Sequence, residues 1–185
     1  LGIWLDVIPR DRRKNALAKV LSKSDAGFAA SGEVPAMTVA TYYFRFYLAR
    51  AVDYAGLGDD YLKLLGPWRE MVSLGLTTWA ESPEPTRSDS HAWSAHPNYD
   101  FLRIVAGVRP GSAGFEKITI EPHLGALKNV KAAMPVPQGV VEVEYQRSAD
   151  GLEARVNLPD GAHGEFLWKG RVTVLHAGTQ TVRLP

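Results

Sequence analysis

The chain has 185 residues, of which 45% are apolar and 22% charged, and 21 basic residues nearly balance 20 acidic ones for a net charge of +1. This composition excludes an intrinsically disordered chain, and the absence of cysteine excludes disulfides and thiolate metal sites. No block of basic residues supports a nucleic-acid partner, the apolar runs are too short to cross a membrane, and no signal-peptide pattern is visible.

The first predicted element is the apolar run from Leu1 to Ile8, which we interpret as the end of a helix closed by Pro9. Because the chain opens abruptly and without Met, we expect a fragment of a longer polypeptide, the alternative being a mature or tag-cleaved chain. A second helix is predicted from Asp11, its cap, to Lys23. Its apolar stripe contains Ala16, Leu17, Val20 and Leu21. Its basic residues are interpreted as a solvated face: Arg10, Arg12, Arg13, Lys14, Lys19 and Lys23.

A loop of small residues from Ser24 to Pro35 leads to a long helix predicted over 37–54. Apolar residues cover most sides of that helix, which is typical of a buried helix. The next helix is predicted to start at Asp59 or Asp60 and to end at Gly75. Gly66-Pro67 is expected to kink or split it.

The stretch from Leu76 to Trp93 has no periodicity and holds two tryptophans, three acids, an arginine and a histidine. Pro83 and Pro85 exclude a regular helix there, so we predict a loop that displays functional side chains. A further helix is predicted to begin at Pro97 and to end at Gly107-Val108-Arg109-Pro110.

From Gly111 onward, short segments alternate apolar and polar residues and are separated by turn residues. The predicted strands are 115–122, 130–134, 140–146, 152–158, 164–168, 172–176 and 179–184. We therefore predict a multi-part fold, α then β: helices of a barrel or toroid in residues 1–110, and an antiparallel β-sandwich in residues 111–185.

The central loop could support carbohydrate chemistry. Glycoside hydrolases use two carboxyl groups, and indole rings pack against sugar rings. Glu81 is the candidate catalytic carboxylate, and Trp79 and Trp93 flank it. Arg87, Asp89 and His91 can form hydrogen bonds with sugar hydroxyl groups.

Other chemistries fit the loop less well. His91 and His96 are five residues apart and lack a third ligand in suitable spacing, so we predict no metal and no cofactor. Asp89, Ser90 and His91 are consecutive and therefore cannot form a catalytic triad. Glu84 is a second candidate acid, but the prolines on both sides of it favour an exposed turn.

Three segments together resemble bacterial α-L-rhamnosidases of glycoside hydrolase family 78. Residues 71–81, MVSLGLTTWAE, are similar to their Met-Val-x-x-Gly-Ala-Thr-Thr-x-Trp-Glu pattern. Residues 101–110, FLRIVAGVRP, preceded by Ser90-His91, resemble a Val-Ala-Gly-Ile-Arg-Pro helix end and the Asn-His segment before it. Residues 114–122, GFEKITIEP, resemble the first strand of the C-terminal sandwich of that family.

The resemblance implies the last helices of an (α/α)6 barrel followed by a β-sandwich, in a bacterial enzyme that hydrolyses terminal α-L-rhamnosides with inversion. By this resemblance Glu81 corresponds to the general base and His91 to a histidine near the sugar. Trp79 and Trp93, which flank Glu81 in the sequence, are expected to bind the substrate with them. The general acid would lie upstream, so the chain alone is expected to be inactive and to need the missing N-terminal part of the polypeptide. The substrate would be a rhamnose-containing glycan or glycoside.

The sequence departs from the family pattern at Ala80, where the family has Trp, and in a shorter loop from Glu81 to His91. Two alternative functions follow from the residues. One is a carbohydrate-binding module with a helical adaptor, in which Tyr145 and Trp168 of the β half would contact sugar. The other is a helical-toroid glycosidase of different sugar specificity.

Overall fold

The computed structural model describes residues 1–28 and 36–185, and residues 29–35 of the predicted loop from Ser24 lie outside the described part. The chain divides into two compact units, here called the helical unit (Leu1–Tyr99) and the sandwich unit (Asp100–Pro185). The predicted domain division at residue 110 stays a prediction. None of the helices in the described part of the chain is long and apolar enough to span a bilayer.

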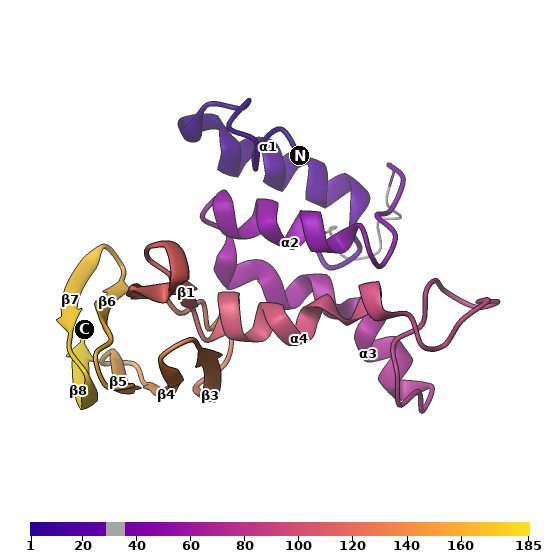
Figure 1. Ribbon diagram of the computed structural model, residues 1–185. Coiled ribbons are helices and arrows are strands. Elements are labelled where there is room, and N and C mark those ends of the chain that lie inside the picture. Colours follow the sequence, from indigo (N-terminus) through magenta and orange to yellow (C-terminus); the bar gives the residue numbers. More distant parts are fainter. Residues whose placement is uncertain (29–35) are drawn as a thin grey trace. The chain divides into compact units, whose positions relative to one another are not determined.

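The helical unit is built from short helices joined by turns (Figure 1). In chain order they are α1 (Arg10–Ser24), α2 (Arg45–Tyr54), the 3-10 helix η1 (Gly58–Leu65), α3 (Gly66–Ser73), the 3-10 helix η2 (Ala92–Ala95) and α4 (His96–Asp100). The predicted split at Gly66-Pro67 is confirmed, because η1 ends and α3 begins there with proline in its first turn. Proline is accepted at that position since its missing N–H would have no helical partner.

Two predicted helices of this unit are wrong in part. Residues 1–8 form turns rather than a helix end, because Val7 and Ile8 both donate backbone N–H groups to the carbonyl of Gly2. The helix predicted over 37–54 is confined to Arg45–Tyr54. Several residues before it are β-branched, which lowers helix propensity, and the N–H of Met37 is already bonded to the carbonyl of Lys23.

Arg13 is a correction to the predicted solvated basic face of α1. Its side chain is buried, forms an ion pair with Asp6 and donates from Nε to the carbonyl oxygen of Ile8 at 2.7 Å. The other five basic residues of this set are exposed, as predicted. Arg13 therefore fixes the turn that precedes α1. Asp11 lies in the first turn of α1 and does not cap it.

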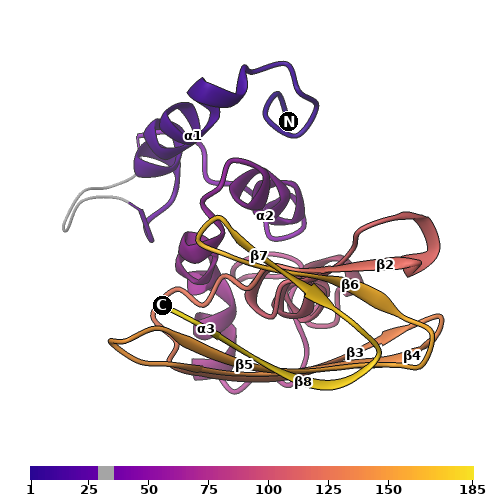
Figure 2. The same ribbon diagram turned by 90° about the vertical axis from the view of Figure 1, so that its left-hand side faces the viewer.

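The sandwich unit contains two four-stranded sheets, which Figure 2 shows as two layers. One sheet has the order β1-β2-β6-β7 and the other β3-β4-β5-β8. The strands are β1 (Val108–Pro110), β2 (Lys117–Ile120), β3 (Asn129–Val136), β4 (Gly139–Arg147), β5 (Leu152–Leu158), β6 (His163–Trp168), β7 (Arg171–Leu175) and β8 (Gly178–Leu184). All seven predicted strands are present, with shifted ends in most cases.

Alternation along the strands forms the core of the sandwich. In β5, residues Leu152, Ala154, Val156 and Leu158 are buried, while the residues between them are exposed or half-buried. The same period of two along the other strands supplies a single apolar cluster between the sheets. Every strand pair is antiparallel except β2 with β6, which is parallel. The antiparallel prediction is therefore confirmed with one exception.

The strand β1 was not predicted, because residues 105–110 were assigned to the end of a helix. A single π-helical turn, η3 (Phe101–Val105), precedes it. Gly107 then turns the chain with φ of +77°, and its missing Cβ would lie 2.2 Å from the backbone of Glu121. Only glycine permits both this conformation and this close approach, so the chain can enter the sheet directly beside β2.

Candidate active site

Helix α3 holds both flanks of the predicted functional loop. The indole Nε1–H of Trp68 donates to the carbonyl oxygen of Ser94 at 2.8 Å, beyond the loop. The backbone N–H of Ala80, in the first arm of the loop, donates to the Sδ of Met71 at 3.4 Å. Both side chains are buried and lie three residues apart on one face of the helix. No pattern in the sequence predicts that these two side chains anchor the loop.

The loop that these two contacts anchor forms a hairpin, here called the site hairpin (residues 78–91). Its arms are joined by backbone bonds from the N–H of Glu81 to Ser88 O at 2.9 Å and from the N–H of His91 to Trp79 O at 2.8 Å. The hydroxyl of Thr78 also donates to the carbonyl of Asp89. These bonds hold the two arms side by side. The hairpin therefore brings His91, on the second arm, next to Trp79 and Glu81 on the first.

The carboxylate of Glu81 forms a two-pronged ion pair with Arg87. Nε of Arg87 lies 2.6 Å from Oε2, and Nη2 lies 2.5 Å from Oε1. The hydrogen bonds from Arg87 lower the pKa of the Glu81 carboxyl, and the positive charges of Arg87 and His91 lower it further, against a smaller opposing effect of desolvation. Glu81 is therefore ionised at neutral pH. From the sequence, Arg87 was expected only to form hydrogen bonds with sugar hydroxyl groups, since nothing in its spacing predicted this pairing.

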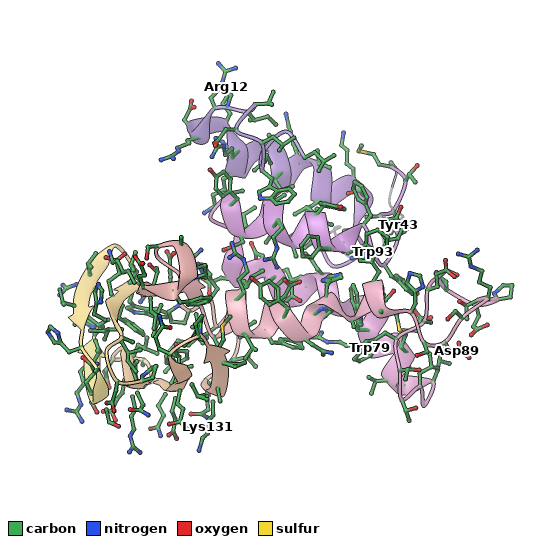
Figure 3. The ribbon with its side chains drawn as sticks, in the orientation of Figure 1. Arg12, Tyr43, Trp79, Asp89, Trp93 and Lys131 are labelled. Carbon is green, nitrogen blue, oxygen red and sulfur yellow. The ribbon has the colours of Figure 1, made fainter. Side chains whose placement is uncertain are left out.

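Trp93 lies on η2, directly after the site hairpin. The N–H of Ser94 bonds to the carbonyl of His91 at 3.0 Å, which joins η2 to the hairpin. Trp93 is 57% exposed, and the centroid of its ring lies 5.0 Å from that of Tyr43. The two labelled side chains lie side by side in Figure 3. Trp79, by contrast, is half-buried. Trp93 consequently offers a large open aromatic face, and Tyr43 is a neighbour that sequence reasoning missed.

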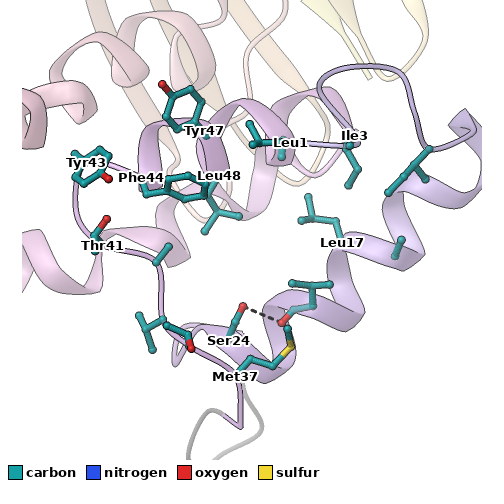
Figure 4. A pocket seen from close by; sticks show the side chains of 18 residues that line it. Leu1, Ile3, Leu17, Ser24, Met37, Thr41, Tyr43, Phe44, Tyr47 and Leu48 are labelled. Atoms are coloured by element: carbon teal, nitrogen blue, oxygen red, sulfur yellow. Dashed lines mark hydrogen bonds between the residues drawn. The ribbon is translucent and has the colours of Figure 1, made fainter.

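Tyr43 also borders a groove of about 620 Å³ in the helical unit, shown in Figure 4. Its walls come from the first residues of the chain, from α1 and from residues 37–51, and most are apolar, among them Leu17, Val20 and Phe44. The groove is apolar because the apolar stripe of α1 is only partly covered: Leu17 is buried, whereas Val20 is 44% exposed. The groove beside Tyr43 is thus largely apolar.

His96 is a scaffold residue. Its ring packs edge to face on Trp68 at 5.0 Å, and Nε2–H donates to the carbonyl of Tyr42 at 3.3 Å. Burial lowers its pKa to about 4, so the ring is neutral at physiological pH. Among residues 1–28 and 36–185, no three His, Asp or Glu side chains gather in a way that could hold a metal ion.

The remaining candidates lie outside this arrangement. Glu84 is exposed at the tip of the site hairpin, where its Oε2 accepts the backbone N–H of Thr86 at 3.1 Å. Tyr145 and Trp168, which the binding-module alternative requires as sugar platforms, are both buried in the sandwich core. The Tyr145 hydroxyl donates to the carbonyl of Ala106 at 2.7 Å. These two aromatic residues therefore contribute to folding, and they are not exposed to bind sugar as the binding-module alternative requires.

Comparison with known proteins identifies relatives of both units. Residues 107–181 match the family model of the bacterial alpha-L-rhamnosidase C-terminal domain. A search of curated protein sequences found no match.

Among solved structures, the alpha-L-rhamnosidase from Dictyoglumus thermophilum is similar over 97% of this chain, with a TM-score of 0.78 and 22% identity. The Streptomyces avermitilis alpha-L-rhamnosidase, solved with L-rhamnose, is similar over 100% of this chain, with a TM-score of 0.75 and 16% identity. The GH78 family rhamnosidase of Bacillus sp. GL1 is similar over 84%, with a TM-score of 0.68 and 22% identity.

These likenesses confirm the resemblance drawn from the sequence and the order of helices followed by a sandwich. The chain covers 24%, 21% and 19% of the Dictyoglumus, Streptomyces and Bacillus chains, respectively, so it corresponds to a minor part of each of them.

Proposed function

We propose that the chain is the C-terminal part of an inverting glycoside hydrolase acting on terminal α-L-rhamnosides, because residues 107–181 match the model of the bacterial alpha-L-rhamnosidase C-terminal domain. In this proposal the helical unit supplies the last helices of an (α/α)6 barrel, and a preceding part of the same polypeptide supplies the others. That preceding part also supplies the general acid.

Glu81 is the general base in this proposal. In an inverting site the two carboxyl groups stand roughly 6.5–9.5 Å apart, and a water molecule lies between the base and the sugar. Glu81 takes a proton from that water as its oxygen attacks the anomeric carbon, while the upstream acid protonates the leaving oxygen. The observation that supports the assignment is the paired site hairpin, in which backbone hydrogen bonds join the arms that carry an ionised Glu81, Trp79 and His91.

The other site residues bind the sugar. The open indole face of Trp93 suits the apolar face of a pyranose ring. Trp79 offers a second, partly covered aromatic surface, and His91 is placed to hydrogen-bond a hydroxyl group. None of these roles requires a metal or a cofactor, in line with an acid–base mechanism that uses carboxyl groups alone.

The test is Glu81→Gln in the complete natural polypeptide that contains this chain, with Glu84→Gln as the matched control on the same hairpin. General base assistance contributes about 10²–10⁴-fold, so Glu81→Gln should lower turnover of an aryl α-L-rhamnoside by that order without loss of folding. Glu84→Gln should keep wild-type turnover, because Glu84 bonds only to the hairpin tip. Near-normal activity of Glu81→Gln would remove Glu81 from the mechanism.

Two further measurements test the rest of the proposal. The 185-residue chain by itself should show no rhamnoside hydrolysis, because the general acid belongs to the preceding region. Measurable hydrolysis by the purified chain would refute that assignment. A panel of aryl glycosides offered to the complete polypeptide should be cleaved selectively at α-L-rhamnose, and preference for another sugar would point to a helical-toroid glycosidase of different specificity.

A further inference from the structure

The side chain of Arg87 forms hydrogen bonds with both carboxylate oxygens of Glu81 across the tip of the site hairpin. The planar guanidinium donates from Nε to one oxygen at 2.6 Å and from Nη2 to the other at 2.5 Å. The backbone bond from Glu81 to Ser88 fixes the register that places position 87 beside position 81. Resting on the function proposed above, we infer that Arg87 is the positioning residue of the base: its two hydrogen bonds fix the plane of the Glu81 carboxylate.

A purely structural role does not account for this pair. The Arg87 side chain is 84% exposed, and exposed ion pairs add little to folding stability because water and salt screen them. Holding a long arginine side chain in one geometry also costs conformational entropy. The consequence of the contact therefore lies in the state of Glu81 rather than in the stability of the unit.

The polar groups next to Arg87 on the tip form hydrogen bonds with the backbone and do not compete with Glu81 for its guanidinium. Glu84, the nearest competing acid on the tip, is bonded to the backbone N–H of Thr86. The hydroxyl of Thr86 donates to the carbonyl of Ser88 within the tip. The charged groups that act on Glu81 are thus Arg87, on the returning arm, and His91 at its end.

The fork still leaves Glu81 able to act as a base. A carboxylate has about four lone-pair directions, and the two bonds from Arg87 use one on each oxygen. The remaining directions can accept a water molecule, in an orientation set by the fork. Lysine would supply the charge but not this geometry, because its ammonium group is a single point donor. The two contributions of Arg87, charge and orientation, can therefore be separated by substitution.

The experiment compares Arg87→Gln, Arg87→Lys and the control Arg69→Gln, an exposed arginine on α3, in the complete natural polypeptide. Rates with an aryl α-L-rhamnoside are measured across pH. Arg87→Gln should lower kcat by about 10–10²-fold, the scale expected for a misplaced catalytic group, with KM changed less than about twofold. The acidic limb of kcat/KM should move to higher pH, because Glu81 then protonates more readily. Arg87→Lys should keep the wild-type acidic limb and recover part of kcat, and Arg69→Gln should match wild type.

A second readout does not depend on activity. The carboxyl carbon of Glu81, followed by NMR in the 185-residue chain, should titrate at higher pH in Arg87→Gln than in the wild type. If Glu81→Gln abolishes turnover while Arg87→Gln keeps the wild-type kcat and pH profile, the positioning role is wrong and the proposed function stands. If Glu81→Gln remains active, the proposed function fails and the positioning role fails with it.

Discussion

Lowering the pH should destabilise the scaffold beneath the site hairpin through a single side chain, His96. Its ring is packed on Trp68 and Phe46, and its Nε2–H donates to the carbonyl of Tyr42. Burial is the main cause that lowers its pKa to about 4; the bond to Tyr42 opposes the shift, and the charges of Arg50 and Arg45 add to it. Between about pH 4 and pH 6.5, His96 is therefore neutral in the folded protein and protonated in the unfolded chain.

The sign and size of the effect follow from that difference. An unfolded histidine titrates near 6.5, so the stabilisation is complete above pH 6.5 and is lost as the pH falls from there to about 4. This gap corresponds to about 3 kcal/mol at most. Because the ring is only partly buried, solvent screening reduces the expected loss to about 1–2 kcal/mol.

The assay is urea unfolding of the 185-residue chain between pH 7 and pH 4.5, followed by the helical circular dichroism signal, which reports the helical unit. The matched control is His96→Gln, whose amide can still donate to the Tyr42 carbonyl but does not titrate. Carboxylates such as Glu165 titrate in both proteins, so the difference between them isolates His96. The wild type should lose about 1–2 kcal/mol more than His96→Gln over this range. Parallel curves would refute the reasoning.

Two further substitutions test the framework of each unit. Trp68→Phe removes the buried donor to η2 and leaves a carbonyl unsatisfied, so the helical unit should lose about 1–3 kcal/mol in urea unfolding, and unchanged stability would show that the anchor is unimportant. Gly107→Ala forces a methyl group against backbone only 2.2 Å away at a positive φ, so the sandwich unit should lose at least about 1–3 kcal/mol, whereas Gly161→Ala, at a positive φ with open space around it, should cost less.

The sequence predicted best the parts whose burial repeats along the chain. The strand predicted at 152–158 has the same bounds in the structure, because every second residue of Leu152–Leu158 faces the core. The break at Gly66-Pro67 was also predictable from local backbone chemistry alone. β1 was missed because three residues are too few to show a period, and its formation depends on a turn at Gly107. The parallel pairing of β2 with β6 joins distant segments, for which the sequence holds no local signal.

The sequence was enough to propose residues for the candidate site, but it did not predict their geometry. Trp79, Glu81 and His91 stood out because a tryptophan-rich polar loop interrupts two periodic regions. The grip of Arg87 on Glu81 was not predictable, since it depends on the register of a hairpin that has no repeating pattern. The burial of Arg13 was missed for a similar reason, because its partner Asp6 lies in an irregular turn. Contacts that depend on irregular backbone produce no repeating sequence pattern, so they cannot be predicted from periodicity.

The most direct test of the central claim, that Glu81 activates a water molecule, is chemical rescue of Glu81→Ala in the complete natural polypeptide. Azide needs no deprotonation, so it can attack the anomeric carbon from the space left by the carboxylate. We predict that hydrolysis of an aryl α-L-rhamnoside falls by about 10²–10⁴-fold and that added azide restores turnover, with a rhamnosyl azide of inverted configuration as the product. Hydrolysis at the wild-type rate, or a variant that stays folded but gains nothing from azide, would contradict the account.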